Sequence, residues 1–237
     1  MKKLILTSLI FFTQLLFAQN INVYLALEDT GLHQQIQTFN EKLDALGIFS
    51  RYDIEPFLNK HPLHVTLYLT NYTEDKLPII EQKIANIAKH WHPIDIHTTN
   101  LFLTAGNYLM LDVDNERPLN GPNTALQQLS DEITLALAND RDFTAPIPPW
   151  AQSIPEKRKA FLGYGSPNVF FEYSPHLSLM AKNFTDPNQA QQFQAELNTL
   201  INETPFPALN IKAYTIGIGE VDEFGQITRA LSRYSLS

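Results

Sequence analysis

Cysteine is absent from the chain, and basic residues are fewer than acidic ones. Without cysteine the protein has no thiol nucleophile, no thiolate zinc site and no disulfide framework. The net charge of −8 at pH 7 argues against extended nucleic-acid binding, because a polyanion binds a cationic surface. A small anionic substrate held in one locally basic pocket is still compatible with this charge.

Long apolar runs are also lacking, apart from residues 4–18, which follow Lys2 and Lys3 and end at Ala18. This run is shorter than the roughly 20 residues that a membrane-spanning helix needs. A basic start, a short apolar run and a small final residue are typical of a secretory signal peptide. We therefore predict a signal peptide over residues 1–18 and an exported protein, periplasmic or secreted, with no membrane attachment after cleavage. An uncleaved N-terminal anchor is the alternative.

The chain is 44% hydrophobic and 18% charged, which suffices for one substantial core. We expect a monomer with a single domain over residues 19–237. Apolar patterning predicts strands at residues 21–27, 63–69, 94–103, 108–113, 169–180, 209–218 and 226–234. Helical spacing predicts helices at residues 33–46, 73–91, 125–138 and 187–201. Hairpins recur between the helices, so we predict an α+β fold with mainly antiparallel sheets and outer helices.

Residues 141–168 form a proline-rich insert in which no regular pattern is visible. Five of the 15 prolines fall here, and the segment carries a local charge of +2 in an acidic chain. One interpretation is a surface connection whose basic residues lie in water. The other is a loop that recruits and covers an anionic substrate, because long loops in compact domains are often functional lids.

An internal repeat is the most informative feature of the sequence. The segment His64-Val65-Thr66-Leu67 leads, four residues on, to Asn71-Tyr72-Thr73-Glu74. At the same spacing, His176-Leu177-Ser178-Leu179 leads to Asn183-Phe184-Thr185-Asp186. A predicted helix and two predicted strands follow each copy, and the copies start 112 residues apart. Two copies predict two pseudo-symmetric lobes, with equivalent elements facing each other across a central cleft.

Each copy of the repeat presents an imidazole beside a hydroxyl. Residues i and i+2 of a strand share a face, so His64 points the same way as Thr66, and His176 the same way as Ser178. Two such strands related by a pseudo-twofold axis would line one pocket with two imidazoles and two hydroxyls.

This set of groups suits displacement at phosphorus. One group must take a proton from the attacking oxygen and another must protonate the leaving oxygen, and histidine can do either because its pKa is about 6.5. The hydroxyls of Thr66 and Ser178 can donate hydrogen bonds to the non-bridging oxygens. The scheme requires neither a metal nor a cofactor. It leaves open which of His64 and His176 is the acid and which is the base.

Both segments fit the pattern H-x-[ST]-x with apolar x, and the paired pattern resembles the two-histidine (2H) phosphoesterases. This superfamily contains the 2′–5′ RNA ligase-like proteins and cyclic nucleotide phosphodiesterases. The resemblance implies a two-lobed α+β fold and metal-independent cleavage of a 2′,3′-cyclic or 2′–5′ phosphodiester in a small nucleotide or RNA end. It also implies that His64 and His176 are the acid–base pair, and that Thr66 and Ser178 bind the substrate phosphate.

Two other hypotheses about function remain open at this stage. A non-catalytic phosphate- or nucleotide-binding protein could have the same fold. A metal-dependent hydrolase could use His61 with the two motif histidines, although no carboxylate lies at close spacing. For the rest of a substrate, the candidates for base stacking or for a lid are Tyr68, Trp150, Arg158 and Tyr164.

Overall fold

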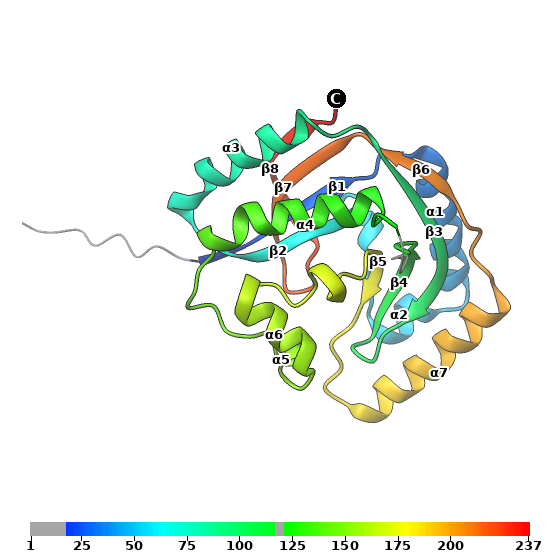
Figure 1. Ribbon diagram of the computed structural model, residues 1–237. Coiled ribbons are helices and arrows are strands. Elements are labelled where there is room, and N and C mark those ends of the chain that lie inside the picture. The colour runs from blue at the N-terminus through cyan, green and yellow to red at the C-terminus, as the bar shows by residue number, and fades with distance from the viewer. Residues whose placement is uncertain (1–17, 117–120) are drawn as a thin grey trace, which may run out of the picture.

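The computed structural model describes residues 18–116 and 121–237 (Figure 1). Residues 1–17 of the predicted signal peptide lie outside these ranges, so that prediction stays a prediction. The strands are β1 (Ala18–Ala26), β2 (His64–Thr73), β3 (Ile94–Leu103), β4 (Tyr108–Val113), β5 (His176–Ala181), β6 (Asn210–Ala213), β7 (Thr215–Val221) and β8 (Ile227–Ser235). The α-helices are α1 (Thr30–Ala45), α2 (Ile48–Tyr52), α3 (Leu77–Ala88), α4 (Ala125–Leu137), α5 (Pro149–Gln152), α6 (Pro155–Tyr164) and α7 (Pro187–Glu203). Short 3-10 helices are η1 (Phe57–Asn59), η2 (Glu74–Lys76), η3 (Ala138–Asp140) and η4 (Phe170–Glu172).

Within the described ranges the strands form two four-stranded sheets, ordered β2-β1-β7-β8 and β5-β4-β3-β6. All neighbouring strands are antiparallel, which confirms the predicted α+β class. Each sheet has a motif strand at one edge: β2 begins with His64 and β5 begins with His176. These two edge strands contact each other, so the topology brings the two copies of the motif together.

The lobes exchange strands, which the repeat in the sequence does not reveal. β3 follows β2 and α3 in the chain but pairs with β4 in the second sheet, and β7 returns to pair with β1 in the first. Each sheet therefore contains two strands from the other half of the chain: β7 and β8 in the first sheet, and β3 and β4 in the second. The predicted strand at residues 209–218 is wrong as a single element, because the chain crosses between the sheets at Tyr214, from β6 to β7.

The predicted strand at residues 169–180 is also too long. Regular pairing starts only at His176, and the preceding residues form the 3-10 helix η4. Phe170 has a φ of +54°, in the left-handed region that a strand does not use. The motif histidine consequently stands at the first position of its strand, next to a tight turn.

The core lies on one face of each motif strand. A buried apolar cluster joins both sheets to α1, α3, α4 and α7, and α4 contacts β2 and β3 (Figure 1). Val65 and Leu67 of β2 are 0% exposed, and Leu177 and Leu179 of β5 are 1% exposed. The motif histidines and hydroxyls lie on the other face of each strand. Irregularities in the register at Leu67 and Leu179 then return Tyr68 and Met180 to the core.

The proline-rich insert is more ordered than its sequence suggests. Pro149 and Pro155 occupy the first turns of α5 and α6, where the missing N–H is tolerated because it would have no helical partner. The end of α6 is attached to β2, since Tyr68 Oη donates to the Tyr164 carbonyl and Thr70 Oγ1 donates to the Gly165 carbonyl. In the part of the chain that the structure describes, no helix is both long and apolar enough to span a bilayer.

Candidate active site

The two motif histidines are held in the same way. His64 Nδ1 lies 3.1 Å from the Pro62 carbonyl, and His176 Nδ1 lies 2.8 Å from the Ser174 carbonyl. A carbonyl can only accept, so Nδ1 carries the proton in both rings and donates it. In the neutral imidazole, Nε2 is then the basic nitrogen. The tautomer that acid–base chemistry needs is thus fixed in both copies by a carbonyl two residues upstream.

A hydrogen bond links the two copies directly. Tyr173 Oη, three residues before His176, donates to the Thr66 carbonyl over 2.9 Å. The Tyr173 side chain is 3% exposed, so its hydroxyl is fixed by its surroundings as well as by this bond. Together with the contact between β2 and β5, this bond places His176 and Ser178 beside the strand of His64 and Thr66.

Both imidazoles are neutral at neutral pH. The pKa of His64 is lowered to about 4, chiefly by burial; the Pro62 carbonyl opposes this shift, and the proximity of His176 adds to it. Burial also lowers the pKa of His176 below its ordinary value; the Ser174 carbonyl and the Asp112 carboxylate oppose this. Because an anion raises the pKa of a nearby base, a bound phosphate diester favours protonation of one ring.

Asn22 is a functional residue that the sequence analysis missed. Its side chain is 0% exposed, and its Nδ2 donates to Thr66 Oγ1 over 2.8 Å. Thr66 therefore accepts from Asn22 and keeps its own proton for another acceptor, such as a phosphate oxygen. The available signal was an amide in the otherwise apolar strand 21–27, a residue type that is rarely buried without a specific partner.

The ring of Tyr24 supports His64 from β1. The two ring centroids lie 5.5 Å apart at an interplanar angle of 70°. Gly217 is the register partner of Tyr24 on β7, and a Cβ added there would lie 2.3 Å from Tyr24 Cζ. A glycine is thus required at position 217, because a larger residue would occupy the space of the Tyr24 ring that packs against His64.

The insert contributes Lys157 to this region, although the sequence analysis selected Arg158. The Lys157 ammonium donates to Asn168 Oδ1 over 2.9 Å and to the Glu172 carbonyl over 2.7 Å. Its charge also lowers the pKa of His176. Arg158 is exposed. The cation of the insert that is near the motifs is therefore its half-buried lysine.

The aromatic candidates lie in different environments. Tyr68 is 1% exposed, so its proposed role in base stacking is wrong: the ring packs in the core. Trp150, on α5, is 52% exposed. Tyr164 packs edge-to-face on Phe170, with 4.6 Å between the ring centroids, and Phe170 belongs to the turn that precedes β5.

His61, the third histidine of the metal hypothesis, is oriented by other groups. Its Nδ1 lies 3.0 Å from the Ile227 carbonyl, and its Nε2 lies 3.8 Å from Asp222 Oδ2. Across residues 18–116 and 121–237 there is no cluster of three His, Cys, Asp or Glu side chains placed to hold a metal ion. The contacts of His61 with the described residues therefore fit a structural role near His64.

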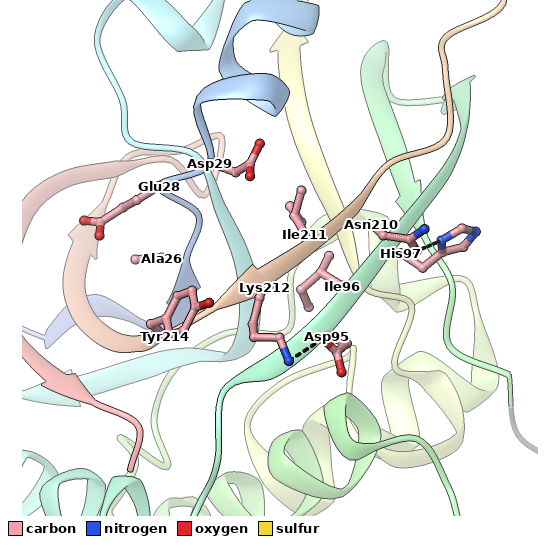
Figure 2. A pocket seen from close by; sticks show the side chains of 10 residues that line it. All are labelled: Ala26, Glu28, Asp29, Asp95, Ile96, His97, Asn210, Ile211, Lys212 and Tyr214. Carbon is pink, nitrogen blue, oxygen red and sulfur yellow. Dashed lines mark hydrogen bonds and ion pairs between the residues drawn. The ribbon is translucent and has the colours of Figure 1, made fainter.

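A cavity of about 550 Å³ lies elsewhere in the fold (Figure 2). It is bordered by the segment between β1 and α1 and by β3 and β6, and none of the four motif residues lines it. The carboxylates of Glu28, Asp29 and Asp95 surround it, and Lys212 Nζ pairs with Asp95 Oδ1 at 2.8 Å. Like charges repel, so this cavity is unsuited to a phosphate group.

Comparisons with known proteins agree with this fold. E. coli LigT complexed with ATP is 13% identical, with 93% of this chain and 99% of that chain covered and a TM-score of 0.50. TT0787 of Thermus thermophilus is 13% identical (92% and 97% covered, TM-score 0.54), and Kluyveromyces marxianus Usb1 is 14% identical (92% and 98%, TM-score 0.50). No curated protein sequence matched the chain. Residues 31–212 match the family described as the 2'-5' RNA ligase superfamily, and the chain belongs to this superfamily of two-histidine phosphoesterases.

Proposed function

We propose that this protein is a metal-independent phosphodiesterase that hydrolyses a 2′,3′-cyclic or 2′–5′ phosphodiester in a small nucleotide or at an RNA end. Members of its superfamily are phosphoesterases, which supports the reaction class. The observation that carries the proposal is that Nδ1 of His64 and Nδ1 of His176 make the same hydrogen bond, on two edge strands that contact each other. The ATP complex of LigT is evidence of nucleotide binding in that relative, and supports a nucleotide substrate here.

The reaction needs two proton transfers, and the two rings supply both. Nε2 of the neutral imidazole takes a proton from water as the water oxygen forms a bond to phosphorus. Nε2–H of the protonated imidazole gives its proton to the ribose oxygen as the bond from phosphorus to that oxygen breaks. The product is a phosphate monoester, and proton exchange with water then restores the starting state. Thr66 and Ser178 donate hydrogen bonds to the non-bridging oxygens, where charge is concentrated.

Turnover of a 2′,3′-cyclic nucleotide in the presence of a chelator tests this proposal. We expect hydrolysis by the wild-type protein and a loss of at least about 100-fold in kcat for both His64→Ala and His176→Ala, the range for removal of an acid–base group. Circular dichroism checks that both variants fold. Activity that the chelator abolishes would indicate a metal-dependent hydrolase. Activity that neither substitution changes would also contradict the proposal.

A non-catalytic protein that binds phosphate groups or nucleotides is the second candidate, because the same hydroxyls and neutral imidazoles can hold a phosphate without turnover. Calorimetric titration with a 2′,3′-cyclic nucleotide separates the two. Tight binding with no product after prolonged incubation would favour the binding protein. Product formation at a rate that depends on both histidines favours the enzyme.

We further propose that residues 1–18 direct export and that the mature protein is a monomer in the periplasm or outside the cell. Cleavage after Ala18 would leave Gln19 as the first residue, within β1. N-terminal sequencing of protein from the periplasmic fraction is expected to start at Gln19. Recovery of the protein in the membrane fraction with Met1 intact would contradict this.

A further inference from the structure

The two motif histidines face different residues on their neighbouring strands. In the first sheet, the register partner of His64 is Ala26 of β1. In the second sheet, the register partner of His176 is Asp112 of β4. Directly opposed residues of an antiparallel pair have Cβ atoms about 5 Å apart on the same face of the sheet. A methyl group therefore stands beside one imidazole and a carboxylate beside the other.

The burial pattern of both strands puts the carboxylate on the face of the motif. On β4, Leu111 and Val113 are buried in the core, whereas Asp112 between them is partly exposed. On β5, His176 is partly exposed and Leu177 is buried. Alternate residues of a strand point to opposite faces, so the side chains of Asp112 and His176 project away from the core together.

The Asp112 carboxylate also has a fixed neighbour on β3. Thr99 Oγ1 donates to Asp112 Oδ2 over 3.4 Å, next to the register irregularity between Thr98 and Leu101. In residues 18–116 and 121–237, no lysine or arginine forms an ion pair with Asp112. The charge of the carboxylate is therefore not already paired with a permanent cation, and it can act on the imidazole that it faces.

Charges of both signs act on the second motif histidine. Burial lowers the pKa of His176, and the Ser174 carbonyl opposes this. Of the charged groups, Asp112 raises the pKa of His176 and Lys157 of α6 lowers it. The Lys157 ammonium lies 3.3 Å from Glu172 Oε2, so its own charge is partly compensated. The carboxylate of Asp112 therefore favours a proton on this ring.

The first motif histidine has a different electrostatic environment. Among the described residues, the charged groups that act on His64 are the imidazoles of His176 and His61, and both lower its pKa. The groups that oppose this shift are the backbone carbonyls of Pro62 and Gly225. The pseudo-symmetry of the motifs is thus broken by charge, because a carboxylate faces only the second histidine.

We propose that Asp112 is a positioning residue that makes His176 the general acid and leaves His64 as the general base. This inference rests on the proposed phosphodiesterase function and assigns its two proton transfers. His64 Nε2 takes a proton from water as the water oxygen forms a bond to phosphorus. His176 Nε2–H gives its proton to the ribose oxygen as the bond from that oxygen to phosphorus breaks. Proton exchange with water then restores both rings, and the carboxylate stays ionised throughout.

A substrate whose leaving group needs no proton separates the two roles. Nitrophenolate can leave without a proton, because p-nitrophenol is a much stronger acid than a ribose hydroxyl group. The wild-type protein is expected to hydrolyse both adenosine 2′,3′-cyclic phosphate and bis(p-nitrophenyl) phosphate. His176→Ala is expected to lower kcat/KM by at least about 100-fold for the cyclic nucleotide and by less than about 10-fold for the nitrophenyl ester. His64→Ala is expected to lower kcat/KM by at least about 100-fold for both compounds.

The opposite pattern, in which only His64→Ala spares the ester, overturns the assignment. Equal losses on the two compounds in His176→Ala also overturn it. A wild-type protein that hydrolyses the cyclic nucleotide but not the ester counts against the assignment as well, because the scheme needs only the base for the ester.

The role of the carboxylate is tested with the same two compounds. Asp112→Asn is expected to lower kcat/KM for the cyclic nucleotide by about 10-fold, the equivalent of one pKa unit, and to change it little for the ester. Asp112→Glu keeps the charge and is expected to retain most of the activity. Asp114→Asn is the matched control, because Asp114 is an exposed carboxylate just after β4. Thermal unfolding checks that every variant is folded, and equal losses on both compounds in Asp112→Asn would indicate a structural role and overturn the proposal.

NMR titration of the His176 ring separates failure of this assignment from failure of the proposed function. If the wild-type protein hydrolyses neither compound, the phosphodiesterase proposal is overturned, but the effect of Asp112 on the ring can still be measured. A lower pKa of His176 in Asp112→Asn, with no such change in Asp114→Asn, supports the role of Asp112. An unchanged pKa of His176 in Asp112→Asn overturns it.

Discussion

Asn22 of β1 donates a hydrogen bond from Nδ2 to Oγ1 of Thr66 on β2, over 2.8 Å. The amide is fully buried, and its Oδ1 has no hydrogen-bond partner among the described residues. A buried amide with one unsatisfied atom reduces stability, so its presence is better explained by its effect on Thr66 than by packing. The bond leaves the proton of the threonine hydroxyl available for another acceptor.

Replacement of Asn22 by leucine is expected to lower kcat/KM for a 2′,3′-cyclic nucleotide by about 10-fold, the equivalent of one oriented hydrogen bond. The check is a double-mutant cycle. Asn22→Leu is expected to add little to Thr66→Val, since the hydroxyl is then already gone. Added to Ser178→Ala, which affects the other motif, it is expected to retain its full effect. Equal effects in the two backgrounds would show that Asn22 acts only on stability.

Acid is expected to destabilise the fold through His64. Its pKa is about 4 in the folded protein and about 6.5 when unfolded, so between these values the unfolded chain binds more protons. The contribution of His64 to the free energy of unfolding is therefore fully present above pH 6.5. As the pH falls toward 4, this contribution decreases by about 3 kcal/mol. Denaturant unfolding at a series of pH values measures the loss.

The contribution of His64 is isolated by comparison with His64→Gln. In this variant the free energy of unfolding is expected to depend less on pH between 6.5 and 4. His90→Gln is the control, because the His90 side chain is exposed and its removal leaves the buried ring in place. If wild-type and His64→Gln proteins lose stability in parallel, the buried neutral state of His64 is refuted.

Gly217→Ala is expected to destabilise the protein by about 1–3 kcal/mol, the range for overpacking. The new Cβ would lie 2.3 Å from Tyr24 Cζ, so the tyrosine ring that supports His64 must move. Activity is expected to fall with stability, and Tyr24→Leu in the same chain is expected to recover part of the stability. Gly163→Ala on α6 is the control: no atom lies within 4 Å of its added Cβ, and alanine favours the helix. Equal denaturation midpoints for both alanine variants would contradict the prediction.

Lys157→Gln is expected to raise the pKa of His176, because the lysine charge lowers it, and to raise KM for an anionic substrate. NMR titration of the His176 ring measures the first effect, and steady-state kinetics measure the second. Arg158→Gln removes the neighbouring exposed charge and is expected to have a smaller effect on both, since solvent screens it. A downward shift of the His176 pKa in Lys157→Gln would be the opposite of the expected sign.

Local patterning predicted most elements of the fold, because apolar periodicity reports which face of an element is buried. β3 and β4 start and end at the predicted residues, and the two His-x-hydroxyl strands could be identified from the repeat alone. The pattern could not show that Tyr214 lies at a crossing between sheets, since the burial of β6 and of β7 does not reveal which sheet each strand joins. Strand partners depend on contacts far apart in sequence, which a local window does not contain.

The same limit applies to the site. His64, His176 and the two hydroxyls form a repeated motif, so they could be selected from the sequence. Asn22 occurs once, and it contacts Thr66 only because folding places β1 beside β2. Tyr68 was misassigned for the converse reason, because an aromatic residue near a motif can face the core instead of the cleft.

The exchange of β3 and β7 between the sheets makes each half of the gene dependent on the other. A polypeptide cut between β3 and β4 would yield one fragment with the first histidine and one with the second, and neither could complete its own sheet. Mixing the two fragments is the condition under which both sheets close. Such a split protein would therefore act as a reporter whose signal appears only when its pieces associate.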